Sequence, residues 1–138
     1  NVEVNDDEDV KIDDTIDSTE ITSSSIFTSS TFEEIGVENE QILNNLQKMQ
    51  IYGPTNIQEV AVPNLSQGRH TIIKAQTGSG KTLAFLLPLS NLLDPNMRKI
   101  QCLILAPSRE LVLQISDVAE ALFKDTGIRS LGLIGGAI

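Results

Sequence analysis

The chain has 138 residues, a length that allows one domain of ordinary size, and a net charge of −9. Residues 1–20 carry nine acids and one base, so the other 118 residues have a net charge of only −1. No apolar run is long enough to cross a bilayer, and no secretory leader is recognisable. Cys102 is the single cysteine, which excludes an internal disulfide and indicates a reducing, intracellular compartment.

Residues 1–30 consist mainly of Asp, Glu, Ser and Thr, with isolated Val and Ile. Such a segment repels itself and has no continuous apolar face to bury, so we predict a disordered acidic leader. A tail that binds a partner or inhibits the rest of the chain is the alternative. The ordered domain is predicted to cover residues 31–138.

Apolar periodicity predicts alternating helices and strands in this domain. The predicted helices cover 38–49, 55–68 with Thr55 as the cap, 81–93 with a perturbation at Pro88, and 108–123 with Ser108 as the cap. The predicted buried strands cover 71–75, 101–106 and 129–134. This order favours an α/β fold in which right-handed crossovers build a parallel sheet with flanking helices.

Residues 75–82 read Ala-Gln-Thr-Gly-Ser-Gly-Lys-Thr, between the first predicted strand and a helix. A glycine-rich turn in this position points backbone N–H groups into one small space, where a polyphosphate fits. Lys81 adds a positive charge for the outer phosphates, and Thr82 offers a hydroxyl to Mg²⁺. An ordinary structural turn is the alternative interpretation.

The carboxyl ends of the three predicted strands carry polar or glycine-rich segments. These segments begin at Ala75, Pro107 and Gly135. Ligands of open parallel sheets gather at that edge, so the sequence predicts one functional edge.

Separated motifs then resemble one family, the DEAD-box RNA helicases. Residues 54–58 resemble its Q motif, and residues 75–82 match its form of the phosphate loop (P-loop). Residues 107–111 resemble its motif Ia, and Gly135-Gly136 resembles its double-glycine motif. The resemblance covers roughly residues 32–138 and implies an incomplete RecA-like P-loop NTPase domain that uses ATP and Mg²⁺ and binds RNA.

The resemblance also implies residue roles. Gln58 would hydrogen-bond the adenine edge, with support from Thr55, and Phe32 would lie against the adenine ring. A side-chain amide has both a donor and an acceptor, so Gln58 can distinguish adenine from guanine. The implied ATP-binding set is Phe32, Thr55, Gln58, Gln76, Thr77, Gly78, Ser79, Gly80, Lys81 and Thr82. Of these, Lys81 and Thr82 would serve catalysis, and Thr82 would be the metal ligand.

RNA would be held at its phosphates and sugars, independently of base sequence. The implied RNA-binding set is Pro107, Ser108, Arg109, Gly135 and Gly136. Several of the assigned residues could instead have purely structural roles. Gln58 could be a surface residue of its helix, Phe32 a core aromatic, Arg109 a partner of an acid on its own helix, and the double glycine an ordinary turn.

The family's Asp-Glu-Ala-Asp and Ser-Ala-Thr motifs and its second domain do not occur in these 138 residues. Phosphoryl transfer needs a carboxylate and cations that the missing parts would supply. We therefore expect the chain alone to be inactive as an ATPase and helicase, and its partners to include the rest of the helicase core as well as RNA. A non-catalytic, truncated nucleotide- or RNA-binding protein is the alternative, and an unrelated P-loop kinase or transporter would leave the other motifs unexplained.

Overall fold

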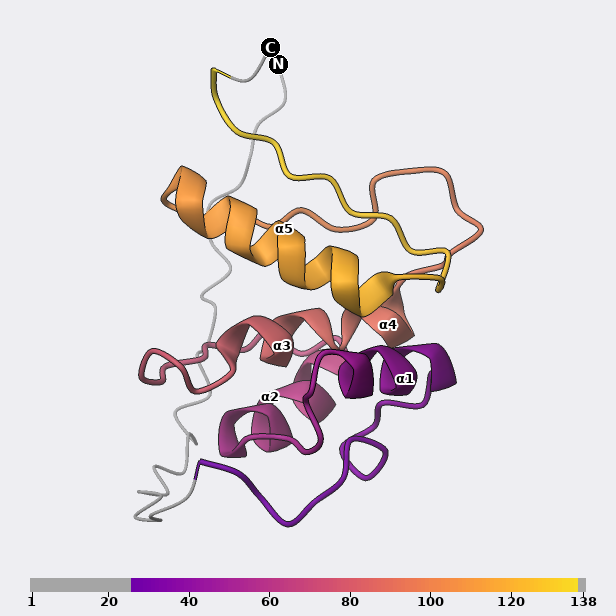
Figure 1. The fold of residues 1–138 in the computed structure, drawn as a ribbon, viewed down its shortest axis with the longest axis vertical. Coiled ribbons are helices and arrows are strands. Elements are labelled where there is room, and N and C mark those ends of the chain that lie inside the picture. Colours follow the sequence, from indigo (N-terminus) through magenta and orange to yellow (C-terminus); the bar gives the residue numbers. More distant parts are fainter. Residues whose placement is uncertain (1–25, 137–138) are drawn as a thin grey trace, which may run out of the picture.

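The computed structural model describes residues 26–136, and its regular structure is helical (Figure 1). The helices are α1 (Glu40–Lys48), α2 (Asn56–Ser66), α3 (Lys81–Leu86), α4 (Leu89–Leu92) and α5 (Arg109–Phe123). In Figure 1, α5 crosses above α3 and α4, and α1 and α2 lie below them. Both α1 and α3 pack against α5, and α2 packs against the other side of α3.

The core lies between these packed helices and is formed by buried apolar side chains of α1, α2, α3 and α5, together with the turn that precedes α1. Burying each large aliphatic side chain stabilises the fold by roughly 1.5–3 kcal/mol. The buried cluster comprises Phe32, Ile35, Val37, Ile42, Leu46, Val62, Leu83, Leu86, Leu87, Ala119, Leu122 and Phe123.

The helix predictions are confirmed, because their signals are local. The Thr55 hydroxyl accepts from the Gln58 N–H at the start of α2, and the Ser108 hydroxyl accepts from the Leu111 N–H at the start of α5. The predicted perturbation at Pro88 divides the 81–93 segment into α3 and α4, since proline has no N–H for the helix ladder.

The predicted burial of the three strands is wrong. Across residues 26–136 the only β pairing is an isolated bridge between Phe27 and Thr55. The apolar runs 71–75, 101–106 and 129–134 have no strand partner there, and their side chains face solvent: Ile72 is 88%, Leu103 77% and Leu131 82% exposed. A strand is stabilised only by neighbouring strands and covering faces, and these runs lie outside the helical core. The parallel sheet is therefore not confirmed.

The N-terminal segment contacts the start of α2. We call residues 26–30 the strap. The Asn56 N–H donates to the Ile26 carbonyl at 2.9 Å, and the Thr28 N–H donates to the Pro54 carbonyl at 3.2 Å. The sequence placed these residues in the acidic leader, whereas the structure places them on the turn before α2. The remainder of the predicted leader, 1–25, lies outside the described residues, and the domain boundary at residue 31 stays a prediction.

Asn45 joins α1 to the far end of α5. Its side chain is 2% exposed, and its Nδ2 donates to the carbonyls of Leu122 and Lys124, both at 2.8 Å. Its Oδ1 accepts from Gln41 Nε2 at 3.0 Å. One amide therefore satisfies two carbonyls at the end of a helix, where no intrahelical donor is available.

We expect Asn45→Ala to lower the free energy of unfolding by about 2–3 kcal/mol, because it leaves the Leu122 and Lys124 carbonyls without this donor. Urea unfolding of the 138-residue chain measures the change. Asn44→Ala, at the exposed neighbouring position, is the control and should change the free energy by less than about 0.5 kcal/mol. Equal effects of the two substitutions would contradict this role for Asn45.

Candidate nucleotide-binding site

The glycine-rich loop between residues 75 and 81 is closed by its own polar groups. The Lys81 ammonium donates to the Ala75 carbonyl at 2.6 Å, across the mouth of the loop. Ser79 donates to the Gln76 carbonyl from its hydroxyl at 2.6 Å and from its N–H at 3.2 Å. Lys81 begins α3, as predicted, and its charge meets a neutral carbonyl that an anion can replace.

Two glycines give this loop its shape. Gly78 and Gly80 have φ values of +82° and +87°, a region that other residues enter at a cost of about 1–2 kcal/mol. Gly80 directly precedes α3 and has no side chain with which to cap it. The glycine positions of the motif therefore match a backbone that requires them.

Gln58 connects this loop to the start of α2. Its Oε1 accepts from the Thr55 N–H at 3.0 Å, and its Nε2 donates to the Gly80 carbonyl at 3.1 Å. Together with the bond from the Gln58 N–H to the Thr55 hydroxyl, this is a capping box. Gln58 is 2% exposed, so the interpretation of Gln58 as a surface residue is wrong.

The Gln58 carboxamide keeps unused bonding capacity. It has two N–H donors and two acceptor lone pairs, and the bonds to Thr55 and Gly80 use one of each. One N–H donor and one acceptor lone pair of the carboxamide therefore remain. The side chain is 2% exposed, so a base edge could reach them only if the groups that cover Gln58 moved aside.

Gly80 packs tightly against this pair. A Cβ atom built on Gly80 would lie 2.5 Å from Gln58 Nε2, 3.0 Å from Thr55 Oγ1 and 3.2 Å from Thr55 Cγ2. On Gly78 it would meet nothing within 4 Å. The motif's second glycine thus permits the contact between the loop and α2, and its first glycine serves the backbone conformation alone.

The other predicted ATP-binding residues differ in accessibility. Gln76 and Thr77 are exposed on the loop, and Thr82 is half-buried in the first turn of α3. Phe32 is 5% exposed within the core cluster. So little exposed ring surface favours the core interpretation of Phe32, and its contact with adenine stays an untested prediction.

Thr82 was the predicted metal ligand, and its hydroxyl is the kind of oxygen that Mg²⁺ binds beside phosphates. Within residues 26–136, no group of three His, Cys, Asp or Glu side chains gathers to hold a metal ion. Thr82 as a metal ligand therefore stays a prediction.

The predicted RNA-binding residues form a second group at the start of α5. A Cβ built on Gly136 would lie 3.8 Å from Arg109 Nη1, so the structure brings motif Ia and the double glycine together. Pro107, Ser108, Arg109, Gly135 and Gly136 are all exposed. No carboxylate among residues 26–136 pairs with Arg109, which argues against the alternative of an ion pair on its own helix.

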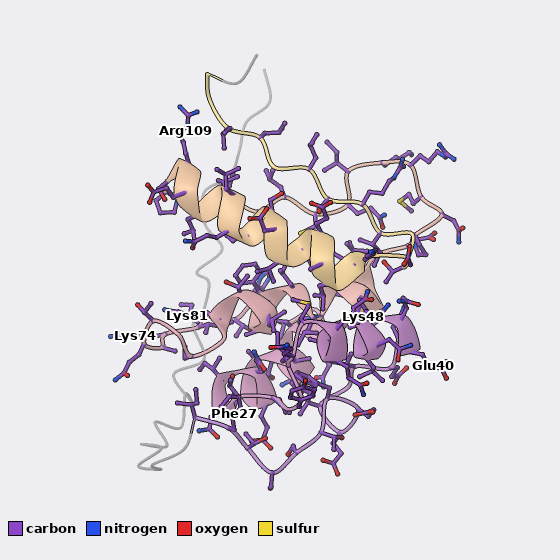
Figure 2. All side chains as sticks on the ribbon, in the orientation of Figure 1. Phe27, Glu40, Lys48, Lys74, Lys81 and Arg109 are labelled. Atoms are coloured by element: carbon purple, nitrogen blue, oxygen red, sulfur yellow. The ribbon has the colours of Figure 1, made fainter. Side chains whose placement is uncertain are left out.

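Figure 2 shows how the two groups lie relative to each other. Lys74 and Lys81 lie at the same side of the molecule as Arg109, with Arg109 above them at the start of α5. The first turns of α3 and α5 therefore open toward one side. The predicted functional edge, at the carboxyl ends of parallel strands, stays a prediction because the described residues form no sheet there.

Cys102 lies in an exposed run, and partial burial raises the pKa of its thiol above the usual value. A raised pKa keeps the thiol protonated at neutral pH, which disfavours a nucleophilic role.

Two features of the site were missed in the sequence. One is the carbonyl partner of Lys81, which local sequence cannot reveal. The other is a hydrogen bond from the Ser30 hydroxyl to Glu59 Oε1, which joins the strap to the first turn of α2. The bond between Gln58 and Thr55 did have a signal, since Thr-x-x-Gln before an apolar run is the capping-box pattern.

Comparison with known proteins defines the class. The profile of the family described as DEAD/DEAH box helicase matches residues 55–137, and the chain belongs to this family. Residues 55–137 include most of the Q motif, the P-loop, motif Ia and the double glycine, so the match covers the motifs that the site is built from.

Particular relatives agree. The chain is 41% identical over 106 residues to an ATP-dependent rRNA helicase RRP3 of Yarrowia lipolytica, covering 77% of this chain and 22% of that protein. It is 41% identical over 105 residues to the DEAD-box ATP-dependent RNA helicase RhpA of Helicobacter pylori, covering 76% and 21%. The chain thus spans about a fifth of the length of these curated relatives.

Solved structures support the fold. The RNA helicase Prp28 from Chaetomium thermophilum, bound to ADP, superposes with a TM-score of 0.71 at 36% identity, covering 81% of this chain and 28% of that one. A DEAD box protein from Methanococcus jannaschii superposes with a TM-score of 0.67 at 33% identity, covering 78% and 30%. The described residues are thus part of a RecA-like fold. None of their helices has the length and apolar character needed to span a membrane.

Gly80→Ala and Gly78→Ala form a matched pair. Both place an alanine at positive φ, which should cost about 1–2 kcal/mol of unfolding free energy. Gly80→Ala should cost at least about 1 kcal/mol more, because its methyl group displaces the buried Gln58 amide. Urea unfolding of both variants without nucleotide checks the difference, and equal losses would show that the contact between Gln58 and Gly80 contributes nothing.

Proposed function

We propose that residues 31–138 are the first part of the ATP-binding domain of a DEAD-box RNA helicase, in which residues 75–82 hold the triphosphate of ATP. The observation that carries the proposal is the bond from Gln58 Nε2 to the Gly80 carbonyl. It links a side chain suited to recognising a base to the loop suited to holding phosphates. A structural turn would have no need of this link.

In this proposal, nucleotide binding moves the Lys81 ammonium from the Ala75 carbonyl to a phosphate of ATP. Its ammonium now meets the Ala75 carbonyl, and a β- or γ-phosphate would offer it a full negative charge instead. The N–H groups of Gln76, Thr77, Gly78 and Gly80 would face the phosphate oxygens, and the Ser79 N–H would leave the Gln76 carbonyl to join them. Binding would therefore break the bonds of Lys81 and Ser79 that close the loop.

Gln58 would select the base. Adenine presents a donor and an acceptor side by side, and the donor and acceptor that Gln58 does not use toward Gly80 and Thr55 would complement both once the base reached them. Guanine presents an acceptor where adenine has a donor, so pairing with guanine would leave polar groups unmatched. Thr55 would hold the carboxamide in this orientation through its N–H.

Mg²⁺ would be held by Thr82 and by the phosphates, and it would neutralise charge on the phosphate oxygens when bound. Lys81 and Thr82 would serve catalysis in this sense, by holding the phosphates and their metal ion.

RNA would bind at the start of α5. Arg109 has no carboxylate partner among the described residues and lies beside Gly136, so an RNA phosphate could contact its guanidinium and the backbone amides together. Pro107 and Ser108 would add exposed backbone before the helix, and Gly135 would permit close approach. These contacts read the sugar-phosphate chain and carry no base specificity.

We also propose that the parallel sheet predicted from the sequence forms in the whole helicase. We infer that the runs 71–75, 101–106 and 129–134 become strands of a parallel sheet when they pair with one another and with further parts of the helicase core. Their exposure supports this inference, because Ile72, Leu105 and Leu133 present apolar side chains that have no cover in the described structure. ATP hydrolysis and RNA unwinding would be activities of the whole helicase, and these 138 residues alone would bind nucleotide without hydrolysing it.

Lys81→Ala should weaken the binding of ATP and ADP alike by about 10- to 100-fold, because it removes a charged hydrogen bond to the phosphates. Titration of the 138-residue chain with each nucleotide in the presence of Mg²⁺ measures this. Lys74→Ala, at an exposed lysine of the same segment, is the control and should bind as the parent chain does. Equal binding by the parent chain and Lys81→Ala would overturn the proposed phosphate site.

Gln58→Ala should lower the preference for ATP over GTP by about tenfold, with a smaller effect on the affinity for inorganic triphosphate. Competition between the three ligands on the same protein measures the ratio. Gln67→Ala, an exposed glutamine just after α2, is the matched control. A uniform loss for all three ligands would count against base recognition by Gln58.

A further inference from the structure

We propose that the strap positions Gln58, and that Ser30 and Glu59 are positioning residues for adenine recognition. This inference rests on the proposed function of Gln58. Its basis is that three hydrogen bonds and one β bridge join the strap to residues 54–59, the same short segment that carries Thr55 and Gln58.

The strap first fixes the turn before α2. The Asn56 N–H is one of the donors that a helix start leaves without an intrahelical partner, and the Ile26 carbonyl accepts it at 2.9 Å. Phe27 forms the antiparallel bridge with Thr55, and Thr28 donates to the Pro54 carbonyl at 3.2 Å. Residues 54–56 are thus held by an added strand-like segment (Figure 2 labels Phe27 there).

The strap next fixes the turn on the other side of Gln58. The Ser30 hydroxyl donates to Glu59 Oε1, and Glu59 directly follows Gln58. A hydrogen bond to a carboxylate is stronger than one between neutral groups. The backbone of Gln58 therefore lies between two anchored neighbours, Thr55 and Glu59.

The carboxamide of Gln58 depends on this anchoring. It must reach the Thr55 N–H and the Gly80 carbonyl at once, at 3.0 and 3.1 Å. The first turn of a helix frays readily when its neighbours are removed. Loss of the strap should therefore let the carboxamide leave Gly80, which would impair base selection while Lys81 and the loop glycines still hold phosphates.

The test compares Ser30→Ala with Ser29→Ala in the 138-residue chain. Ser29 is the exposed neighbour of Ser30, so the control removes the same hydroxyl one position away. The ratio of the ATP and GTP dissociation constants is the main readout, because it does not depend on the folded fraction. We expect Ser30→Ala to lower the preference for ATP by roughly threefold to tenfold and Ser29→Ala to leave it unchanged.

Two further variants separate positioning from general stability. Ser30→Thr keeps a hydroxyl and should retain the parent preference. Ser30→Ala combined with Glu59→Ala should lose no more preference than Glu59→Ala alone, because both changes remove the same bond. Additive losses would show that the two residues act separately and would overturn the pairing.

Hydrogen–deuterium exchange of residues 53–60 without nucleotide tests the strap independently of nucleotide binding. Exchange should quicken by about threefold or more in Ser30→Ala, and unchanged exchange would overturn the inference. Faster exchange with an unchanged preference would leave the strap a purely structural role and would also overturn it. If the parent chain bound no nucleotide, the proposed function would fail, and the exchange result alone would decide whether the strap holds the turn.

Discussion

The Gln58 carboxamide is the interaction on which the site depends. It bonds simultaneously to Thr55, the N-cap residue of its own helix, and to Gly80, which precedes α3 and lies 22 residues after Gln58 in the sequence. Because Gln58 is almost fully buried, neither bond can be replaced by water without cost. The P-loop and the Q motif are thereby joined into one structural unit.

The arrangement explains why glycine is needed at position 80. Any side chain there would fall within 2.5 Å of Gln58 Nε2, so the loop can lie against α2 only if position 80 has no Cβ. The left-handed backbone at Gly78 and Gly80 serves a separate purpose, which is to turn the chain into α3. Gly80 is therefore required for two reasons, the close approach of the loop to Gln58 and the left-handed backbone of the turn.

The sequence predicts the helices of this fold well because helix signals are local. Thr55 and Ser108 cap the helices that follow them, and Pro88 divides α3 from α4. The apolar runs show the limit of such reasoning. Their composition indicates burial, but a strand depends on partners that the run itself does not specify, and Ile72 and Leu103 are exposed in the described structure. Asn45 shows a second limit, since nothing near it in sequence reveals its bonds to the end of α5.

The candidate site was predictable to the extent that motifs fix residue types. The glycines and Lys81 follow from the octapeptide, and the proximity of Arg109 to Gly136 agrees with their common assignment to RNA. Contacts between distant segments were not predictable. In the sequence, the strap belongs to an acidic, serine-rich leader. Only the structure shows that the Ser30 hydroxyl donates a hydrogen bond to the Glu59 carboxylate.

A nuclear magnetic resonance titration of the ¹⁵N-labelled chain with ADP and Mg²⁺ tests the central claim most directly. If the Q motif and the P-loop form one nucleotide site, the largest shifts will fall on the amides of residues 76–82 and on the side-chain amide of Gln58, and GDP will move the Gln58 signal far less. Shifts confined to another surface, such as the groove that α5 forms with residues 127–132, or no shifts at saturating ADP, would contradict the account.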